Sequence, residues 1–202
     1  NATYLLPPEY FIDIGYTDYG VRIVDFDSDG FPDLIQGFGS YNHSWRNTPS
    51  GWQNVDSTWN SPEKFLDGSG VNQGVELVDF NGDGRVDIIK AHEQNPGSTK
   101  AAYLNTGNGW KDVSSLWVLP TLLAHHGGED YGTRFVDLNN DGLVDILSTP
   151  GSGYPGAGAW INTGSGWENA NATWHPPVAF VSGSNDNGVR LQDVNGDGLV
   201  DI

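Results

Sequence analysis

Short runs in which apolar residues alternate with charged or polar ones recur along the chain, and this period of two predicts β-strands. Four such runs, at residues 20–23, 74–77, 132–135 and 188–191, lead directly into a segment rich in Asp and Gly. After that segment an apolar pair, for example Leu34-Ile35, starts a second run. The order predicts a strand, a tight loop and another strand. Because no stretch of 12 or more residues carries the 3.6-residue period, helices are expected to be nearly absent.

Each unit is expected to contain two more strands. The third ends at an aromatic residue, which is Trp45, Tyr103 or Trp160 in successive units. An Asn-Thr-x-x-Gly segment follows, whose residues are typical of a turn, and a fourth strand begins at a Gly-Trp pair. Four strands in ~56 residues is the content of one β-propeller blade. The chain is therefore predicted to be all-β, as a tandem array of propeller-type four-stranded blades.

The unit is an internal repeat, and a repeat of this length determines the fold prediction for the whole chain. The first aspartates of the four acidic segments are 54, 58 and 56 residues apart, which gives about 3.6 repeats. Aromatic markers keep the same spacing, at seven-residue intervals: Trp45, Trp52 and Trp59; Tyr103, Trp110 and Trp117; Trp160, Trp167 and Trp174. Because these residues recur at fixed strand positions, we expect them to pack between blades.

A single repeat array is predicted over residues 1–202. Its parts are the tail of a preceding repeat at 1–8, blades at 20–62, 74–120 and 132–177, and the start of a fourth blade at 188–202. A closed propeller has about 4 to 8 blades. The chain is therefore expected to be part of a larger propeller or array, or to close or polymerise with further copies of itself, since an open stack exposes strand edges and an apolar face.

The acidic segments share the pattern D-x-[DN]-x-D-G-x-x-D, which has the chemistry of a calcium site. Calcium takes about six to eight oxygen ligands, and a short loop supplies them when alternate side chains point inward and a glycine allows a sharp turn. Positions 1, 3, 5 and 9 offer side-chain oxygens, and position 7 offers its carbonyl. The predicted ligands are Asp25, Asp27, Asp29, Phe31 and Asp33; Asp79, Asn81, Asp83, Arg85 and Asp87; Asp137, Asn139, Asp141, Leu143 and Asp145; and Asp193, Asn195, Asp197, Leu199 and Asp201.

Other metal sites fit the sequence less well. A helix-loop-helix calcium hand needs a glutamate at position 12, where this chain has Gln36, Lys90 and Ser148, and its loop is flanked by helices. Magnesium prefers strict octahedral geometry with retained water, so it suits these carboxylate-rich loops less than calcium does. The segment His125-His126 with Glu129 and Asp130 has ligands for a transition metal, but it occurs once and is expected to be a solvated loop.

Charge and composition narrow the choice of partners and compartment. A net charge of −17 repels nucleic acid and anionic membranes, and no apolar run approaches the ~20 residues of a membrane span. The absence of cysteine excludes disulfides and thiolate metal sites. Three N-x-[ST] sequons, at Asn1, Asn42 and Asn171, are glycosylation acceptors if the chain is secreted. These features favour an extracellular protein, secreted or on the cell surface.

The acidic motif on its strand-loop-strand, repeated at this spacing, resembles the FG-GAP/VCBS calcium-binding repeats of the β-propeller head of integrin α subunits and of related lectins and bacterial surface or toxin proteins. The resemblance covers essentially the whole chain. It implies a propeller of about seven blades in which Asp25, Asp27, Asp29 and Asp33, with their counterparts, bind structural calcium. The chain departs from that family in lacking the Gly-Ala-Pro element of the integrin-type repeat.

Binding, if the array has any, is expected on the rim opposite the acidic loops, where the connections vary between repeats. These segments are residues 36–42, 92–100 and 149–158, with the inter-blade segments at 16–19, 67–73, 125–131 and 182–187. No Ser-His-Asp set, carboxylate pair or arginine cluster breaks the repeat symmetry, so the protein is not expected to be an enzyme.

The leading interpretation is a calcium-binding extracellular propeller repeat protein with a structural or adhesive role in surface assembly or protein recognition. Its expected partners are other protein chains or further copies of itself, with no nucleic acid and no membrane insertion. One alternative is a carbohydrate-binding lectin, in which rim aromatics such as Tyr154 contact glycans. Another is a shell segment of a larger toxin or enzyme complex. Fold alone does not decide between them, because propellers serve all three roles.

Overall fold

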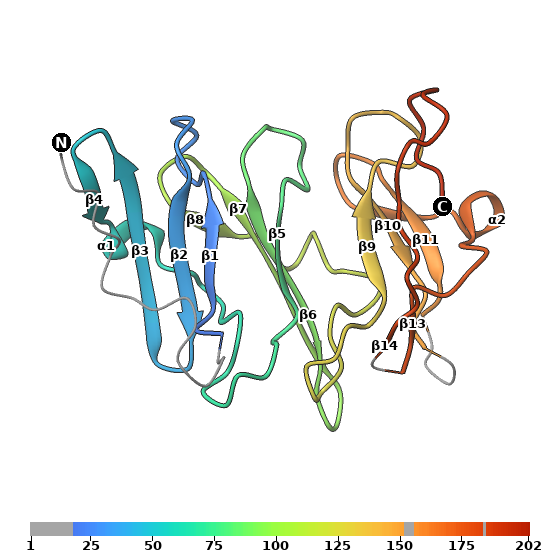
Figure 1. Ribbon diagram of the computed structural model, residues 1–202, viewed down its shortest axis with the longest axis horizontal. Coiled ribbons are helices and arrows are strands. Elements are labelled where there is room, and N and C mark those ends of the chain that lie inside the picture. Colours follow the sequence, from blue (N-terminus) through green and yellow to red (C-terminus); the bar gives the residue numbers. More distant parts are fainter. Residues whose placement is uncertain (1–17, 152–155, 184) are drawn as a thin grey trace.

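The computed structural model describes residues 18–151, 156–183 and 185–202. Within them, three antiparallel four-stranded sheets follow one another along the long axis of the molecule (Figure 1). Each sheet is built from one continuous stretch of sequence, and its strands pair in chain order. The all-β prediction is confirmed. The predicted tail at 1–8, the sequon at Asn1 and the rim residue Tyr154 lie outside the described residues.

The strands have the following bounds. The first sheet contains β1 (Val21–Val24), β2 (Asp33–Phe38), β3 (Tyr41–Thr48) and β4 (Gly51–Asn54). The second contains β5 (Val75–Val78), β6 (Asp87–Glu93), β7 (Ser98–Asn105) and β8 (Trp110–Asp112). The third contains β9 (Thr133–Val136), β10 (Asp145–Ser148), β11 (Gly158–Asn162) and β12 (Trp167–Asn169). A two-stranded sheet of β13 (Val181–Ser182) and β14 (Asn185–Asp186) follows.

The register is the same in all three blades. In each one the first strand ends on a valine that pairs with the aspartate opening the second strand: Val24 with Asp33, Val78 with Asp87, and Val136 with Asp145. Because a one-residue slip would turn every side chain to the other face, this shared register presents equivalent residues in each blade. Each of the first three acidic segments is therefore the connection of a hairpin and lies at the same end of its sheet. The strand predicted at 188–191 is not formed, because the fourth acidic segment is closed only by a single bridge between Gln192 and Asp201.

The third strands extend further than predicted. Each continues two or three residues beyond its aromatic marker, so that the Asn of the Asn-Thr turn segment still pairs with the Trp of the fourth strand: Asn47 with Trp52, Asn105 with Trp110, and Asn162 with Trp167. Asn and Thr are typical turn residues, and sequence reasoning ended the strand at them for that reason. This extension matters because it places the asparagine beside the acidic loop.

Over the described ranges, helix is limited to two single turns, α1 (Asp56–Trp59) and α2 (Asn171–Trp174). One turn is too short to produce a 3.6-residue pattern, so neither turn was predicted. In the described part of the chain no helix is long and apolar enough to cross a bilayer. Both turns end on the third tryptophan of the repeat, and Trp59 is directed in this way into the core.

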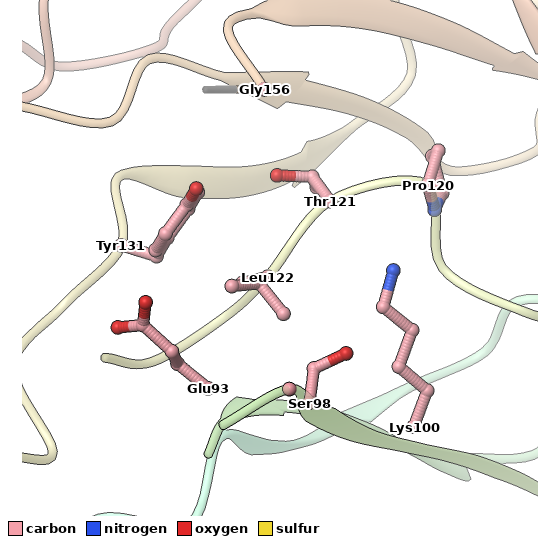
Figure 2. Close-up of a pocket in the computed structure, with 9 residues that line it drawn as sticks. Glu93, Ser98, Lys100, Pro120, Thr121, Leu122, Tyr131 and Gly156 are labelled. Carbon is pink, nitrogen blue, oxygen red and sulfur yellow. The ribbon is translucent and has the colours of Figure 1, made fainter. Parts of the chain in front are cut away.

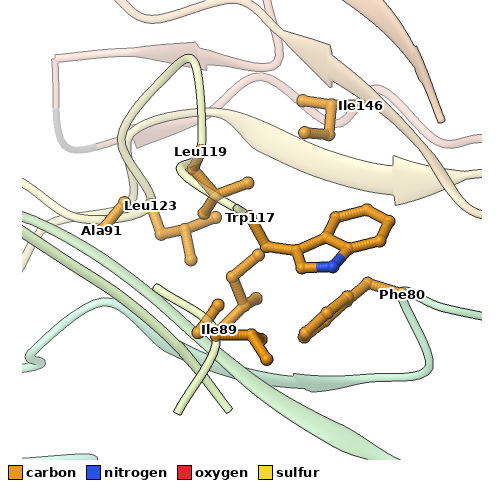
Figure 3. Packing of buried hydrophobic residues seen from close by; sticks show 9 residues of the cluster. Phe80, Ile89, Ala91, Trp117, Leu119, Leu123 and Ile146 are labelled. Carbon is orange, nitrogen blue, oxygen red and sulfur yellow. The ribbon is translucent and has the colours of Figure 1, made fainter. Parts of the chain in front are cut away.

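The core lies between the blades, as predicted for the repeated aromatics. Phe80 comes from the acidic loop of the second blade and is fully buried against Trp117, with ring centroids 4.9 Å apart (Figure 3). Trp117 then lies edge-on to Trp167 of the third blade at 5.4 Å. Phe26 and Trp59 repeat the first contact one blade earlier, at 4.8 Å. Burying such aromatic pairs couples each acidic loop to the packing between neighbouring blades.

The two junctions between consecutive blades differ in their polar contacts. Between the first and second blades, Glu63 accepts hydrogen bonds from the ammonium group of Lys90 at 2.7 Å and from the hydroxyl of Tyr103 at 3.0 Å. Between the second and third blades, the hydroxyls of Thr121 and Ser148 lie 2.9 Å apart at the equivalent place. A charged contact in one junction is thus an uncharged contact in the next.

Candidate metal centres

The acidic loops owe their shape to two residues with positive φ. Position 6 is a glycine in every copy, with φ between 84° and 89°, as the sequence predicted for a sharp turn. Position 4 also lies in the left-handed region, where Ser28 has φ 62° and Asn140 has φ 60°. Few residues other than Gly, Asn and Asp adopt this conformation readily. The turn at position 6 was predicted from the sequence, but the positive φ at position 4 was missed. Together the two positions curl the backbone so that its N–H groups point inward.

Side chains at positions 1, 3 and 5 accept hydrogen bonds from these N–H groups. In the first loop, Asp25 accepts from Asp29 N at 3.2 Å and Gly30 N at 2.9 Å, and Asp27 accepts from Asp29 N at 3.2 Å. Asp29 in turn accepts from Phe31 N at 2.9 Å. The same bonds recur in the other three loops at 2.8 to 3.2 Å. The predicted ligands at positions 1, 3 and 5 are therefore brought together in every copy.

The first loop gathers the most negative charge. One carboxylate oxygen each from Asp25, Asp27 and Asp29 lies within 4.8 Å of the others. In the other loops position 3 is an asparagine, and its side-chain amide donates to the aspartate at position 5, as Asn139 does to Asp141 at 2.9 Å. A close set of carboxylate and amide oxygens is the donor chemistry that a hard divalent cation requires, so these residues fit calcium.

Position 7 does not bring its side chain into this set. Phe31 is 47 % exposed, and Leu143 packs instead against Gly82 of the preceding loop. Arg85 donates from Nη2 to Asp83 at 2.5 Å and from Nε to the carbonyl of Asn105 at 3.0 Å. The contribution predicted from position 7 is its backbone carbonyl, and these side-chain contacts leave that prediction open.

Position 9 is buried in the first three loops, where its carboxylate also anchors the third strand, and its role as a ligand stays a prediction. Asp33, Asp87 and Asp145 are fully buried, and Asp87 accepts hydrogen bonds from Phe80 N at 3.3 Å and Asn105 N at 2.8 Å. Each of the three thus ties the acidic loop to the end of the third strand. Burial raises the pKa of Asp33 to about 6 and of Asp87 to about 7, against the lowering effect of the backbone hydrogen bonds. A cation in the loop would favour the ionised form of these carboxyls.

An arginine from the third strand lies against the first loop. The guanidinium group of Arg46, on β3, donates to Asp29 at 3.0 Å and forms an ion pair with Asp27. Asp27 is the one position-3 aspartate among the four loops, and Arg46 supplies a positive charge beside it. Sequence reasoning did not connect these residues, because Arg46 is 17 residues from Asp29.

The asparagines of the second and third Asn-Thr turn segments connect neighbouring blades. The amide of Asn105 donates to the carbonyl of Phe26, in the loop of the preceding blade, at 2.7 Å, and to that of Val86 in its own blade at 3.1 Å. Asn162 contacts Phe80 and Val144 in the same way, at 2.8 and 3.0 Å. The sequence signal was present, since this Asn recurs in every repeat, but it was interpreted only as turn chemistry.

The histidine segment differs from the solvated loop that was expected. His125 is 4 % exposed, packs on Tyr131 with ring centroids 4.6 Å apart, and has its Nδ1 atom 3.1 Å from Glu93. Asp130 pairs instead with Arg134 at 2.7 Å. The prediction was wrong for His125 because the segment pairs with the end of β6, a contact that is distant in sequence.

The two described sequons are both hydrogen-bonded through their asparagines. The side-chain nitrogen of Asn42 donates to the carbonyl of Ser61 at 2.8 Å, so a glycan there would have to leave the remaining N–H of the amide directed at this carbonyl. Asn171 accepts from the backbone N–H of Ala159 through its side-chain oxygen at 2.5 Å, which leaves its nitrogen for attachment. Asn171 is thus the better acceptor of the two.

Comparison with known proteins agrees with the repeat architecture. The sequence is 27 % identical over 155 residues to the T-cell immunomodulatory protein homolog of Plasmodium falciparum (isolate 3D7), covering 66 % of this chain and 21 % of that protein. The fold is similar to a chain of the Photorhabdus luminescens Tc holotoxin pore, with a TM-score of 0.58 and 17 % identity, over 94 % of this chain and 8 % of that one. The chain thus spans about a fifth or less of these relatives.

The family assignment rests on the repeats themselves. The family described as FG-GAP-like repeat matches the sequence three times, at residues 25–90, 79–148 and 137–202. Each match begins at the first aspartate of an acidic loop, covers the second, third and fourth strands of that blade, and ends beyond the next acidic loop. These three matches extend over most of the chain, and the chain therefore belongs to the FG-GAP-like repeat family.

Proposed function

We propose that this chain is a calcium-stabilised segment of an extracellular propeller-type array, and that its role is structural or adhesive, in surface assembly or protein recognition. The observation that carries the proposal is the fourfold repetition of one loop in which side-chain oxygens at positions 1, 3 and 5 converge. A solvated turn has no need to recur with the same side chains and the same hydrogen bonds.

Calcium would supply positive charge where the chain has gathered negative charge. Asp25, Asp27 and Asp29 hold three carboxylates close together, and like charges at this distance repel each other. The backbone N–H groups that these carboxylates accept from already hold the loop in its curled form. A bound ion would add charge neutralisation to a preorganised loop, and the buried aspartate at position 9 would transmit the gain in order to the strand beneath it.

The extracellular location is supported by the same chemistry. Calcium is abundant outside cells, where modules with dissociation constants of about 10⁻⁴ to 10⁻³ M are occupied. The absence of cysteine and the accessible sequon at Asn171 are compatible with secretion. One similar protein is described as a T-cell immunomodulatory protein homolog, and by analogy we infer that this chain acts at a surface.

The proposed partners are proteins, and no catalytic role is assigned. The blades present repeated hairpin connections on both rims, and the structural neighbour belongs to a holotoxin pore. An array of rigid blades is suited to holding such connections at fixed spacing. Further copies of this chain are partners of the same kind, because strand edges and blade faces can continue from one chain to the next.

Thermal unfolding of the whole chain tests the calcium proposal. With millimolar calcium the melting temperature should be higher than in chelator. Each site whose dissociation constant is tens of times lower than the calcium concentration should add ~2 kcal/mol to the free energy of unfolding. Magnesium at the same concentration should give a smaller shift. Asp79→Asn combined with Asp137→Asn should remove about half of the calcium effect.

The matched control is Glu168→Gln, which neutralises an exposed acid on β12 outside the loops and should leave the calcium effect intact. If the melting temperature in calcium equals that in chelator, the loops are ordinary turns and the proposal is wrong. If Glu168→Gln lowers the calcium effect as much as the loop variants do, the ion acts on overall charge rather than at the loops.

A further inference from the structure

A cavity lies between the second and third blades, on the rim opposite the acidic loops (Figure 2). Its volume is about 310 Å³, at the lower end of the range for small-molecule sites. Side chains with polar groups line most of it, and they are Glu93, Ser98, Lys100, Thr121 and Tyr131. Three of the variable segments in which the sequence predicted binding contribute lining residues: 92–100, 125–131 through Tyr131, and 149–158 through Gly156. The cavity is separate from the candidate metal centres.

Lys100 is the unusual residue of this cavity. Its ammonium group is half-buried and donates to the carbonyl of Leu119 at 2.6 Å. Each of the five arginines and Lys90 forms an ion pair with an acidic side chain, and the remaining lysines, Lys64 and Lys111, are exposed. Among the described residues, Lys100 is therefore the one half-buried cation without an acidic partner. Burial alone accounts for the lowering of its pKa, and no neighbouring carboxylate offsets it.

The repeats provide an internal comparison for this lysine. The equivalent residue in the first blade is Asn42, whose neutral amide donates to the carbonyl of Ser61 at 2.8 Å. Leu119 and Ser61 are also equivalent, so both blades satisfy the same carbonyl. In the third blade the position is Ala157. Because an uncharged donor suffices for this hydrogen bond, the positive charge of Lys100 is not required by the fold.

The groups across the cavity from Lys100 are an acidic side chain and hydrogen-bonding hydroxyls. Glu93 lies at the other end, as Figure 2 shows, and its Oε2 atom is in contact with Nδ1 of His125 at 3.1 Å and with the backbone N–H of His126 at 3.4 Å. Both contacts use Oε2, so Oε1 can accept a hydrogen bond from a ligand. The hydroxyls of Ser98 and Thr121 lie between the two ends, beside Leu122.

We propose that this cavity binds a small carboxylate. Its carboxylate group pairs with Lys100, and its hydroxyl or ammonium groups face Glu93 and the hydroxyls of Ser98 and Thr121. A half-buried ammonium without a counter-charge is stabilised by a bound anion, and a charge-assisted hydrogen bond is about twice as strong as a neutral one. Two kinds of ligand have this chemistry and this size, an acidic monosaccharide and a free amino acid. The proposal is independent of calcium binding.

Isothermal titration of the whole chain with D-glucuronate, L-alanine and neutral D-glucose tests it. At least one of the two carboxylates should bind, and glucose should bind about tenfold more weakly or not at all. Lys100→Gln keeps a donor for the Leu119 carbonyl, as in the first blade, and should weaken the carboxylate by about tenfold or more. Lys111→Gln removes an exposed positive charge and should change nothing. Glu93→Gln should weaken alanine more than glucuronate, because alanine carries an ammonium group.

A second measurement keeps the test independent of the variants. In the unmodified chain, adding the carboxylate that binds should change the amide chemical shifts most at Ser98, Lys100 and Thr121. The proposal is overturned if neither carboxylate binds, if the shifts lie elsewhere, or if a correctly folded Lys100→Gln protein binds as tightly as the unmodified chain.

Discussion

The first and third acidic loops have the same backbone and nearly the same hydrogen bonds, yet they balance their charges differently. The first has aspartates at positions 1, 3 and 5 and the guanidinium group of Arg46 beside them. The third has Asn139 at position 3, whose own amide donates to Asp141, and the described residues include no ion pair to its carboxylates. The first loop thus uses a cation from β3, which is distant in sequence, and the third loop carries one negative charge fewer within its own motif.

This difference shows two ways in which the chain itself offsets the negative charge of such a loop. An amide within the loop costs one carboxylate but needs no partner. An arginine from β3 preserves three carboxylates, but it occupies the side of the loop at which a cation would be attracted. The first loop should therefore be the one in which an ion and a side chain compete.

The largest expected loss of stability follows from removing the buried aspartate at position 9, which both loops share. Asp33→Ala and Asp145→Ala should each lower the free energy of unfolding by about 3 kcal/mol, because each leaves two backbone N–H groups, at least one of them buried, without an acceptor. Urea unfolding in calcium would measure this. Glu168→Ala, on an exposed strand position, should stay within about 0.5 kcal/mol. A loss below about 1 kcal/mol at either aspartate would mean that position 9 is not the common anchor.

A smaller effect should separate the two loops. Asn105→Ala removes the donors to Phe26 and Val86, and we expect it to cost about 1 to 2 kcal/mol. Hydrogen exchange should become faster at the amides of residues 29–31 in the first loop and stay unchanged at residues 141–143 in the third. The control is Asn108→Ala, at an exposed position of the same turn. Equal acceleration in both loops would indicate general loosening of the array rather than loss of one contact.

The smallest effect concerns the charge balance itself. Arg46→Gln removes the competing cation, so the calcium affinity of the first loop should rise by about threefold, the scale of a surface ion pair. The third loop should be unaffected. An NMR titration of the loop amides would resolve the two sites. Arg22→Gln, which breaks an ion pair with Asp18 away from the loops, serves as the control. An unchanged or lower affinity in the first loop would show that Arg46 does not compete.

The strands and hairpin loops were predictable because their information is local. Alternating residues, the glycine at position 6 and the repeat spacing each act within a few residues, and they indicated both the all-β fold and the convergence of positions 1, 3 and 5. The extended third strands and the single-turn helices were missed. In the first case turn residues such as Asn105 took part in strand pairing, and in the second the element was too short to leave a pattern.

The contacts that distinguish one repeat from another were not predictable, because they join residues far apart in sequence. Arg46 reaches Asp29 only through the pairing of β2 with β3, and His125 is buried only because its segment meets the end of β6. Lys100 lay within a segment predicted to form a binding rim, but its lack of a counter-charge depends on the surrounding fold. Repeat symmetry predicts the contacts that all blades share. It does not predict a contact that occurs in one blade alone.

The amide of Asn105 has a consequence for how neighbouring loops respond to one another. It bonds the loop of the first blade and the strand end of the second at once, and Asn162 does the same one blade later. Ordering one loop therefore lowers the conformational entropy that the next has still to lose. For the proposed cation sites, nearest-neighbour statistics predict that occupancy at one loop would raise the affinity of the adjacent one and that the influence of a local defect would decay with the number of blades.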